Sequence, residues 1–265
     1  MERTHALIGF GEAGSTFAAA AGWGRAVAVW DLVSARRDAS ATAGLSAASV
    51  APEAVTGAPL VLSLVTADQS LRAARDYAPL LTPGAVWCDM NSVSPETKRA
   101  SAEAVAAAGG RYVDVAVLAP VDPARLAVPL LLAGEAADEA GAMLRSIGFT
   151  NLRAVGAEVG RASAIKMIRS VMIKGIEALT DEMMAAAGRA GVVDEVVASL
   201  DASEKARPWS ERAAYNLERM ATHGLRRAAE MEEAASTLRA LGVEPLMTTG
   251  TVLRQRAAAG KELQQ

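Results

Sequence analysis

Two groups of residues in this sequence have the types and spacing needed for chemistry on a small molecule. The first is the pattern Gly9-x-Gly11-x-x-Gly14, which follows a short apolar run and precedes a segment of small residues. Such a turn lets the backbone approach a pyrophosphate, and the following helix N-terminus presents N–H groups to the phosphates. The pattern therefore predicts a dinucleotide site, with an ordinary α/β turn as the alternative.

The choice of nucleotide depends on Asp31, an acid that ends the next apolar run, twenty residues after Gly11. A carboxylate there hydrogen-bonds the ribose hydroxyls of NAD and repels the 2′-phosphate of NADP. Arg36 and Arg37 follow closely, and an arginine near that position can accommodate the phosphate. We expect NAD or NADP, with NAD favoured.

The second group surrounds Lys166, which lies among apolar residues in a long segment of helical periodicity. Ser170 lies one turn further along the same helix face. Desolvation lowers the pKa of a lysine, which would let the amine exchange protons near neutral pH. The spacing supports equally a lysine whose stem covers apolar surface while its charge reaches water.

The elements that must position these groups form two domains, 1–156 and 157–265. Up to residue 156, apolar runs alternate with helical segments, and runs apolar on both faces are typical of a buried parallel sheet. The predicted strands are 6–9, 26–30, 60–65, 85–89, 112–117, 129–133 and 152–155. The predicted helices between them include 34–43, 69–80, 94–108 and 137–147. This order predicts a doubly wound, mainly parallel α/β domain of the Rossmann type.

The second domain is predicted to be all-α, because no strand pattern follows residue 156. Its expected helices are 158–188, 193–200, 209–220, 225–241 and 247–259, with breaks at Pro208, Gly224 and 242–245. The small size and many apolar faces of this domain suggest that it contributes to the substrate site and forms a homodimer by sharing helices.

In a doubly wound sheet the ligand lies beyond the carboxyl ends of the strands. Three predicted strand exits carry small or polar residues, at 66–68, 89–95 and 114–120. These segments would meet the cofactor and the substrate, although the same residue types also make ordinary turns and caps.

Composition excludes several classes of function. The net charge of −3 gives no electrostatic basis for binding nucleic acid. We found no apolar stretch long enough to span a membrane and no N-terminal leader, and Cys88 is the only cysteine, which fits a reducing cytoplasm. The only histidines are His5 and His223, so no metal site is expected.

Four segments taken together resemble the β-hydroxyacid dehydrogenases, which include 3-hydroxyisobutyrate dehydrogenase and 6-phosphogluconate dehydrogenase. The segments are 9–14, 89–95, 114–120 and 160–166, and they extend over most of the chain. The C-terminal half looks like a less characterised branch with a shorter helical domain. The resemblance implies hydride transfer between a nicotinamide and a small hydroxy acid or its carbonyl counterpart, with Lys166 as general acid/base and Ser170 as a second catalytic residue.

The resemblance also implies which residues contact the two ligands. The expected cofactor contacts are Gly9, Phe10, Gly11, Glu12, Ala13, Gly14, Asp31, Val65, Thr66 and Asn91. The expected substrate contacts are Asn91, Ser92, Leu118, Ala119, Arg169 and His223. His223 would close the pocket of a neighbouring subunit, or would be an ordinary loop or cap histidine.

Several positions depart from the family pattern. Leu118 stands where a substrate-binding serine is usual, and Pro120 removes a backbone donor. Arg169 and Ser170 replace the usual Asn-Asn or His-Asn, and Arg169 would either clamp an anionic group of the substrate or face solvent. These departures leave two alternatives open: an imine reductase-like enzyme on the same scaffold, and a nucleotide-binding sensor without catalysis.

Overall fold

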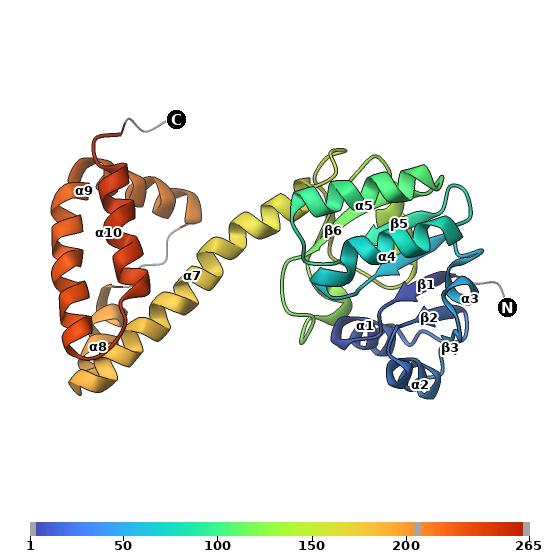
Figure 1. Ribbon diagram of the computed structural model, residues 1–265, viewed down its shortest axis with the longest axis horizontal. Coiled ribbons are helices and arrows are strands. Elements are labelled where there is room, and N and C mark those ends of the chain that lie inside the picture. The colour runs from blue at the N-terminus through green and yellow to red at the C-terminus, as the bar shows by residue number, and fades with distance from the viewer. Residues whose placement is uncertain (1–3, 204–207, 262–265) are drawn as a thin grey trace. The chain divides into compact units, whose positions relative to one another are not determined.

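The computed structural model describes residues 4–203 and 208–261, and the chain divides into two compact units, residues 1–169 and 170–265. In the described part of the first unit, eight strands form one sheet in the order β3-β2-β1-β4-β5-β6-β7-β8 (Figure 1). The strands are β1 (His5–Ile8), β2 (Val27–Trp30), β3 (Ser46–Ala47), β4 (Leu60–Ser63), β5 (Val86–Asp89), β6 (Arg111–Val117), β7 (Leu130–Ala133) and β8 (Leu152–Ala154). All neighbouring strands pair in parallel except β6 and β7. The predicted doubly wound, mainly parallel sheet is confirmed.

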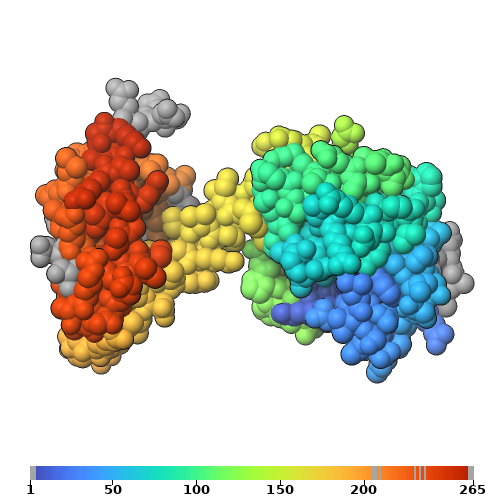
Figure 2. Space-filling view, in the orientation of Figure 1, coloured from blue at the N-terminus to red at the C-terminus, as the bar shows by residue number. Residues whose placement is uncertain are grey.

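Helices cover both faces of this sheet because successive strand residues point to opposite sides. Leu62 and Cys88 belong to the core beneath α1 and α6, whereas Val61 and Trp87 belong to the core beneath α3, α4 and α5. The space-filling view shows α4 and α5 covering one of these faces (Figure 2). The helices of this unit are α1 (Glu12–Ala21), α2 (Ser34–Thr42), α3 (Ala51–Val55), α4 (Ser70–Tyr77), α5 (Pro95–Ala107) and α6 (Ala137–Ser146).

Helix α7 (Arg161–Ala190) begins in the first unit and continues through the boundary at residue 169. Our sequence boundary at 156 precedes this helix. Its first turns belong with the sheet, because Ala162 and Ser163 are buried there and the Ser163 N–H donates to Asp114 of β6. The chain therefore passes between units within a helix rather than through a loop.

The remaining helices of the second unit are α8 (Val193–Ser203), α9 (Trp209–Ala240) and α10 (Leu246–Ala258). The predicted helix break at Gly224 was wrong, because α9 continues through it. A Cβ atom at Gly224 would lie 2.4 Å from the Gln255 carbonyl oxygen, so this glycine allows α9 and α10 to approach closely. His223 consequently lies exposed on a helix and not in a loop.

The carboxylate of Glu182 on α7 caps the N-terminus of α10. It accepts hydrogen bonds from the backbone N–H groups of Met247 and Thr248, at 2.7 and 2.9 Å, and from the Thr248 hydroxyl at 2.6 Å. Burial alone would raise the pKa of Glu182, but these hydrogen bonds outweigh it and leave the pKa below its ordinary value. The cap thus ties α7 to α10 within the second unit.

Several large apolar side chains of α7 are exposed in this chain, including Val171, Met172 and Ile176. Such a surface is compatible with burial against another chain. The homodimer stays a prediction. No helix within the described ranges is long and apolar enough to cross a membrane.

His5 makes the stability of the first unit depend on pH. Its ring is fully buried against Trp23, and burial lowers its pKa from 6.5 to about 4. Between these values only the unfolded chain takes up a proton, so stability is full above pH 6.5 and falls as the pH decreases toward 4. The loss at pH 5 should be about 2 kcal/mol, since each pH unit of difference corresponds to about 1.4 kcal/mol.

We therefore expect His5→Phe to lose less stability than the wild type between pH 7.5 and pH 5. Urea unfolding followed by tryptophan fluorescence measures this, because three of the four tryptophans, Trp23, Trp30 and Trp87, lie in the first unit. His223→Gln, at the exposed position on α9, is the control and should retain the wild-type difference. Identical pH dependence in wild type and His5→Phe would contradict the assignment.

Candidate functional site

The turn between β1 and α1 has the geometry that its glycines predict. Gly9 has φ +95°, and a Cβ atom there would lie 2.3 Å from the Leu64 carbonyl oxygen. A Cβ atom at Gly14 would lie 2.4 Å from the Gly9 carbonyl oxygen. Both positions require glycine, because no side chain fits without moving the backbone of β4 or of the turn itself.

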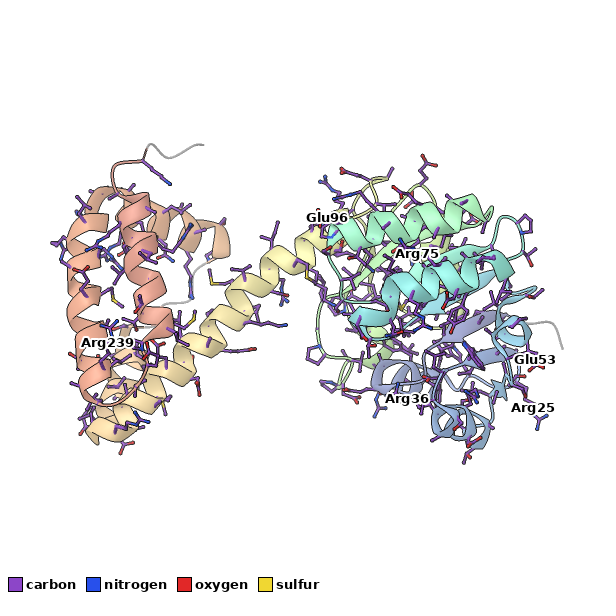
Figure 3. The ribbon with its side chains drawn as sticks, viewed as in Figure 1. Arg25, Arg36, Glu53, Arg75, Glu96 and Arg239 are labelled. Carbon is purple, nitrogen blue, oxygen red and sulfur yellow. The ribbon has the colours of Figure 1, made fainter. Side chains whose placement is uncertain are left out.

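Asp31, at the end of β2, holds this turn in place. Its Oδ2 accepts a hydrogen bond from the Phe10 N–H and its Oδ1 from the Val33 N–H, both at 2.8 Å. The Asp31 carboxylate is buried, and the Nη1 atom of Arg36 lies 3.6 Å from its Oδ2 (Figure 3 labels Arg36). The carboxylate expected to meet the ribose thus also organises the backbone that would meet the phosphates.

Two cavities border the segment from β1 to the start of α1 and share Val65 in their walls. The first has a volume of about 120 Å³ and is lined by Gly9, Asp31, Arg36 and Thr66, among others. The second has a volume of about 330 Å³ and opens at the carboxyl ends of β4, β5 and β6. Its lining residues include Glu12, Ala13, Val65, Asn91, Ser92, Ala119 and Lys166.

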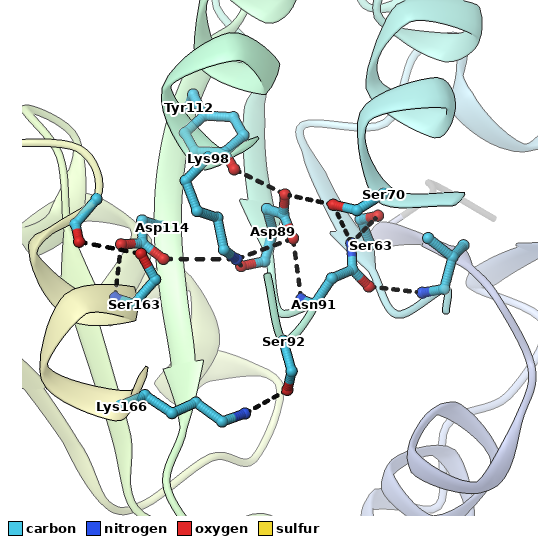
Figure 4. A network of polar contacts seen from close by, with 12 residues as sticks. Ser63, Ser70, Asp89, Asn91, Ser92, Lys98, Tyr112, Asp114, Ser163 and Lys166 are labelled. Atoms are coloured by element: carbon cyan, nitrogen blue, oxygen red, sulfur yellow. Dashed lines mark hydrogen bonds and ion pairs between the residues drawn. The ribbon is translucent and has the colours of Figure 1, made fainter. Parts of the chain in front are cut away.

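Lys166 and Ser92 meet at the wall of the second cavity. The Lys166 ammonium donates to the Ser92 hydroxyl oxygen at 2.5 Å, although 74 residues separate them in the sequence (Figure 4). Ser92 is exposed and Lys166 is half-buried. The sheet therefore brings together two of the residues that the sequence selected independently, one from a strand exit and one from the first turns of α7.

Asn91 lies beside them but points into the protein. Its Oδ1 accepts from the Val65 N–H at 2.7 Å, and its Nδ2 donates to the hydroxyls of Ser63 and Ser70, at 3.1 and 3.2 Å. Asn91 is buried, so its amide joins the ends of β4 and β5 to the start of α4. Asn91 also lines the second cavity, and its predicted contacts with the cofactor and the substrate stay predictions.

A fully buried cluster of charged side chains, which we did not predict from the sequence, lies beneath the carboxyl edge of the sheet. The Lys98 ammonium donates to the Asp89 carbonyl oxygen at 2.6 Å and to Asp89 Oδ1 at 3.0 Å, and lies 3.4 Å from Asp114 Oδ1. The Tyr112 hydroxyl donates to Asp89 Oδ2 at 2.7 Å. Burial and the neighbouring Asp89 carboxylate hold the pKa of Tyr112 well above its ordinary value, so this hydroxyl remains a donor.

A signal for this cluster was present in the sequence. Asp89 ends one largely apolar strand and Asp114 lies within another, and a buried carboxylate requires a partner. Lys98 shares one face of α5 with the buried residues Ser101 and Val105, where a charge is expected only if it is paired. The pattern predicts the need for a cation, but only the fold shows which carboxylates Lys98 meets.

Other predicted site residues lie elsewhere. The Leu118 side chain packs against the buried cluster that contains Ala116 and Ala162, whereas Val117 and Ala119 on either side of it line the second cavity. The Leu118 carbonyl accepts from Arg169 Nη1 at 3.2 Å, so that arginine is bonded within the protein. Ser170 and His223 belong to the second unit, and their roles stay predictions. The described residues contain no group of side chains that could hold a metal ion.

Comparison with known proteins assigns the nucleotide domain. Residues 4–156, more than half of the chain, match the model of the NAD binding domain of 6-phosphogluconate dehydrogenase. The chain belongs to this family. Residues 187–258 match a model described as a domain of unknown function, DUF1932. The predicted resemblance to the β-hydroxyacid dehydrogenases is therefore confirmed, and the chain has the scaffold of an NAD(P)-binding dehydrogenase or reductase.

Relatives support this assignment without naming a substrate. A conserved hypothetical protein from Sinorhizobium meliloti is 38% identical over 97% of this chain and 88% of its own, with a TM-score of 0.64. A conserved protein of unknown function, described as structurally similar to 3-hydroxyacid dehydrogenases, is 30% identical over 96% of this chain and 95% of its own, with a TM-score of 0.62. An uncharacterized 28.5 kDa protein from Methanothermus fervidus is 27% identical over 57% of this chain, and the match spans only 56% of that relative's length.

An imine reductase from Myxococcus stipitatus, in complex with NADP+, shares the fold. It is 20% identical over 96% of this chain and 93% of its own, with a TM-score of 0.78.

A substitution at Gly11 in the glycine turn should weaken nucleotide binding without affecting folding. A Cβ atom at Gly11 would meet only Arg36, at 3.6 Å, and the backbone there is extended, so Gly11→Ala should fold normally. The added methyl group would nevertheless occupy the approach of the pyrophosphate to the α1 N-terminus. We expect Gly11→Ala to weaken NADH and NADPH binding about tenfold or more, a loss of about 1.4 kcal/mol per factor of ten.

Fluorescence titration and thermal unfolding measure the two properties. Gly24→Ala is the matched control, because a Cβ atom there meets nothing within 4 Å. Unchanged nucleotide affinity in Gly11→Ala would place the phosphates elsewhere.

Proposed function

We propose that this protein is an NAD(P)-dependent oxidoreductase that transfers hydride between the nicotinamide and a small hydroxy acid or its carbonyl counterpart. The observation that carries the proposal is the Lys166–Ser92 pair, whose Nζ and Oγ atoms lie 2.5 Å apart in the wall of the second cavity. A proton-exchanging pair beside a dinucleotide turn is the arrangement that such a reaction needs.

The residues of the turn fit the proposed cofactor. Helix α1 begins at Glu12 after Gly11, which has no side chain to cover the N–H groups at the helix start. The first cavity would hold the adenosine beside Asp31 and Arg36, and the second would hold the nicotinamide end beside Ala13 and Val65. The bound nicotinamide supplies or accepts the hydride.

The chain itself would supply the proton. In the reductive direction Lys166 gives a proton to the heteroatom of the carbon that receives hydride, and in the oxidative direction it accepts that proton. Ser92 holds the ammonium at the cavity wall and can place its own hydroxyl hydrogen toward the substrate, since its oxygen accepts from Lys166. The positive charge at this wall suits a substrate that carries a carboxylate or another anionic group.

Imine reduction is the second candidate. Imine reductases and a reductive aminase align over 95% or more of this chain with TM-scores of 0.75 to 0.79, although the identities of 17–21% show the fold alone. The reductive aminase from Aspergillus terreus was solved with NADPH and ethyl levulinate. A cavity with Ala13, Val65 and Ala119 in its wall would also admit a small imine.

Removing the Lys166 amine should abolish most turnover without disturbing the nucleotide site. We expect Lys166→Met to lower kcat by about a hundredfold to ten-thousandfold, the usual contribution of a positioned acid or base. The dissociation constant of NADPH should stay near its wild-type value. Initial rates with a panel of hydroxy acids, aldehydes and cyclic imines measure the effect, and Lys261→Met, at an exposed position, is the control.

Near-normal turnover of any panel substrate by Lys166→Met would rule out the proposed role. Tight cofactor binding by the wild type with no turnover across the panel would favour a nucleotide sensor.

Cofactor preference should depend on the Asp31–Arg36 pair. Asp31 favours NAD, as the sequence indicates, and the half-exposed Arg36 guanidinium beside it offers a partner to the 2′-phosphate of NADP. We expect Arg36→Ala to weaken NADPH binding about tenfold and to leave NADH binding nearly unchanged, because a hydrogen bond to a charged group contributes about 1.5–3 kcal/mol. Titrations with both cofactors measure this, with Arg25→Ala as the control, and equal losses for the two cofactors would contradict it.

A further inference from the structure

The buried ammonium of Lys98 lies beside Asp89, on the strand that leads to Ser92, and beside Asp114, which accepts a hydrogen bond from the start of the helix that carries Lys166. We propose that Lys98 is a positioning residue, which sets the separation of Ser92 and Lys166 by holding Asp89 and Asp114 at the same time (Figure 4). The effect that we expect on turnover rests on the function proposed above.

The first link runs from Lys98 to Ser92 through the end of β5. Lys98 donates to the Asp89 carbonyl at 2.6 Å and to its Oδ1 at 3.0 Å. The same Oδ1 accepts from the Asn91 N–H at 2.9 Å, which forms the turn immediately before Ser92. A shift of the Lys98 ammonium would therefore move the Asp89 carboxylate, which holds this turn through the Asn91 N–H.

The second link runs from Lys98 to Lys166 through β6 and the start of α7. Asp114 Oδ1 lies 3.4 Å from the Lys98 ammonium, and Asp114 Oδ2 accepts from the Ser163 N–H at 2.9 Å. Ser163 lies in the first turn of α7, where N–H groups have no helical partner, and Lys166 follows one turn later. The carboxylate thus anchors the helix end that carries the reactive amine.

The cation is required because Asp89 and Asp114 are direct register partners on adjacent strands. Two like charges placed opposite each other in a sheet repel, and here both are fully buried. Lys98 reaches them from α5 and offsets the repulsion, because its ammonium lies beside the Asp89 carbonyl oxygen, Asp89 Oδ1 and Asp114 Oδ1. A neutral residue of the same length would fill the space without fixing either carboxylate.

The test compares two conservative variants of the cluster. Asp114→Asn keeps the size of the side chain and an oxygen for the Ser163 N–H, but weakens the link to Lys98. Tyr112→Phe removes a buried donor to Asp89 and leaves both links intact, so it controls for general loss of stability. The double variant Lys98→Met/Asp114→Asn keeps the net charge of the cluster and gives the same comparison if the single variant does not fold.

The first readout needs no substrate. Trinitrobenzenesulfonate labels lysine amines, and peptide mass spectrometry gives the rate at Lys166 relative to exposed Lys261 in the same molecule. We expect Asp114→Asn to change this relative rate severalfold and Tyr112→Phe to leave it unchanged. An unchanged rate in Asp114→Asn, or the same change in both variants, would overturn the proposal.

The second readout is turnover of a panel substrate. Asp114→Asn should lower kcat by about ten- to a hundredfold, the effect expected of a displacement of about 1 Å, while the dissociation constant of NADPH stays unchanged. Equal kcat values in Asp114→Asn and wild type would count against the proposal. Absence of turnover in the wild type would refute the proposed function alone, because the labelling comparison would still decide the role of Lys98.

Discussion

One buried ammonium group lies between two carboxylates of the adjacent strands β5 and β6. Lys98, Asp89 and Asp114 are fully buried, so hydrogen bonds within the protein must offset the free-energy cost of removing their charges from water. Tyr112 and Ser70 donate to Asp89, and the backbone N–H of Ser163 donates to Asp114. A buried ion cluster of this kind contributes little to stability by itself, but it admits only a narrow range of geometries. The strand ends and the helix start that it joins are consequently held in one arrangement.

Parallel strands place the other parts of the site at the same edge. Their carboxyl ends meet there, so the turn after β1, the exit of β4 and the exit of β5 surround two neighbouring cavities that share Val65. The glycine turn can approach β4 only because Gly9 has no side chain, and Asp31 fixes the turn from the neighbouring strand. The glycine turn and the Lys166–Ser92 pair are therefore adjacent for a topological reason, although 74 residues separate Ser92 from Lys166.

Features with a local cause could be predicted from the sequence. Apolar runs locate seven of the strands within a few residues, and the glycine spacing locates the turn, because both depend on neighbouring residues. The two-residue strand β3 is too short to show periodicity, and Gly224 suggested a break because the approach of α10 is invisible in the sequence. Lys98 was missed for a similar reason. The sequence indicates that Asp89 and Asp114 need a cation, but only the fold shows that Lys98 of α5 lies beside both carboxylates.

We propose that the carboxyl edge of the sheet carries out hydride transfer and is more than a nucleotide-binding surface. The decisive measurement uses NADH and NADPH with deuterium at both C4 positions of the nicotinamide, and mass spectrometry of the products formed from the carbonyl and imine panel. We expect one deuterium on the reduced carbon of at least one product made by the wild type, and formation of that product about a hundredfold or more slower with Lys166→Met. Saturating cofactor binding by the wild type with no deuterium in any product would contradict it.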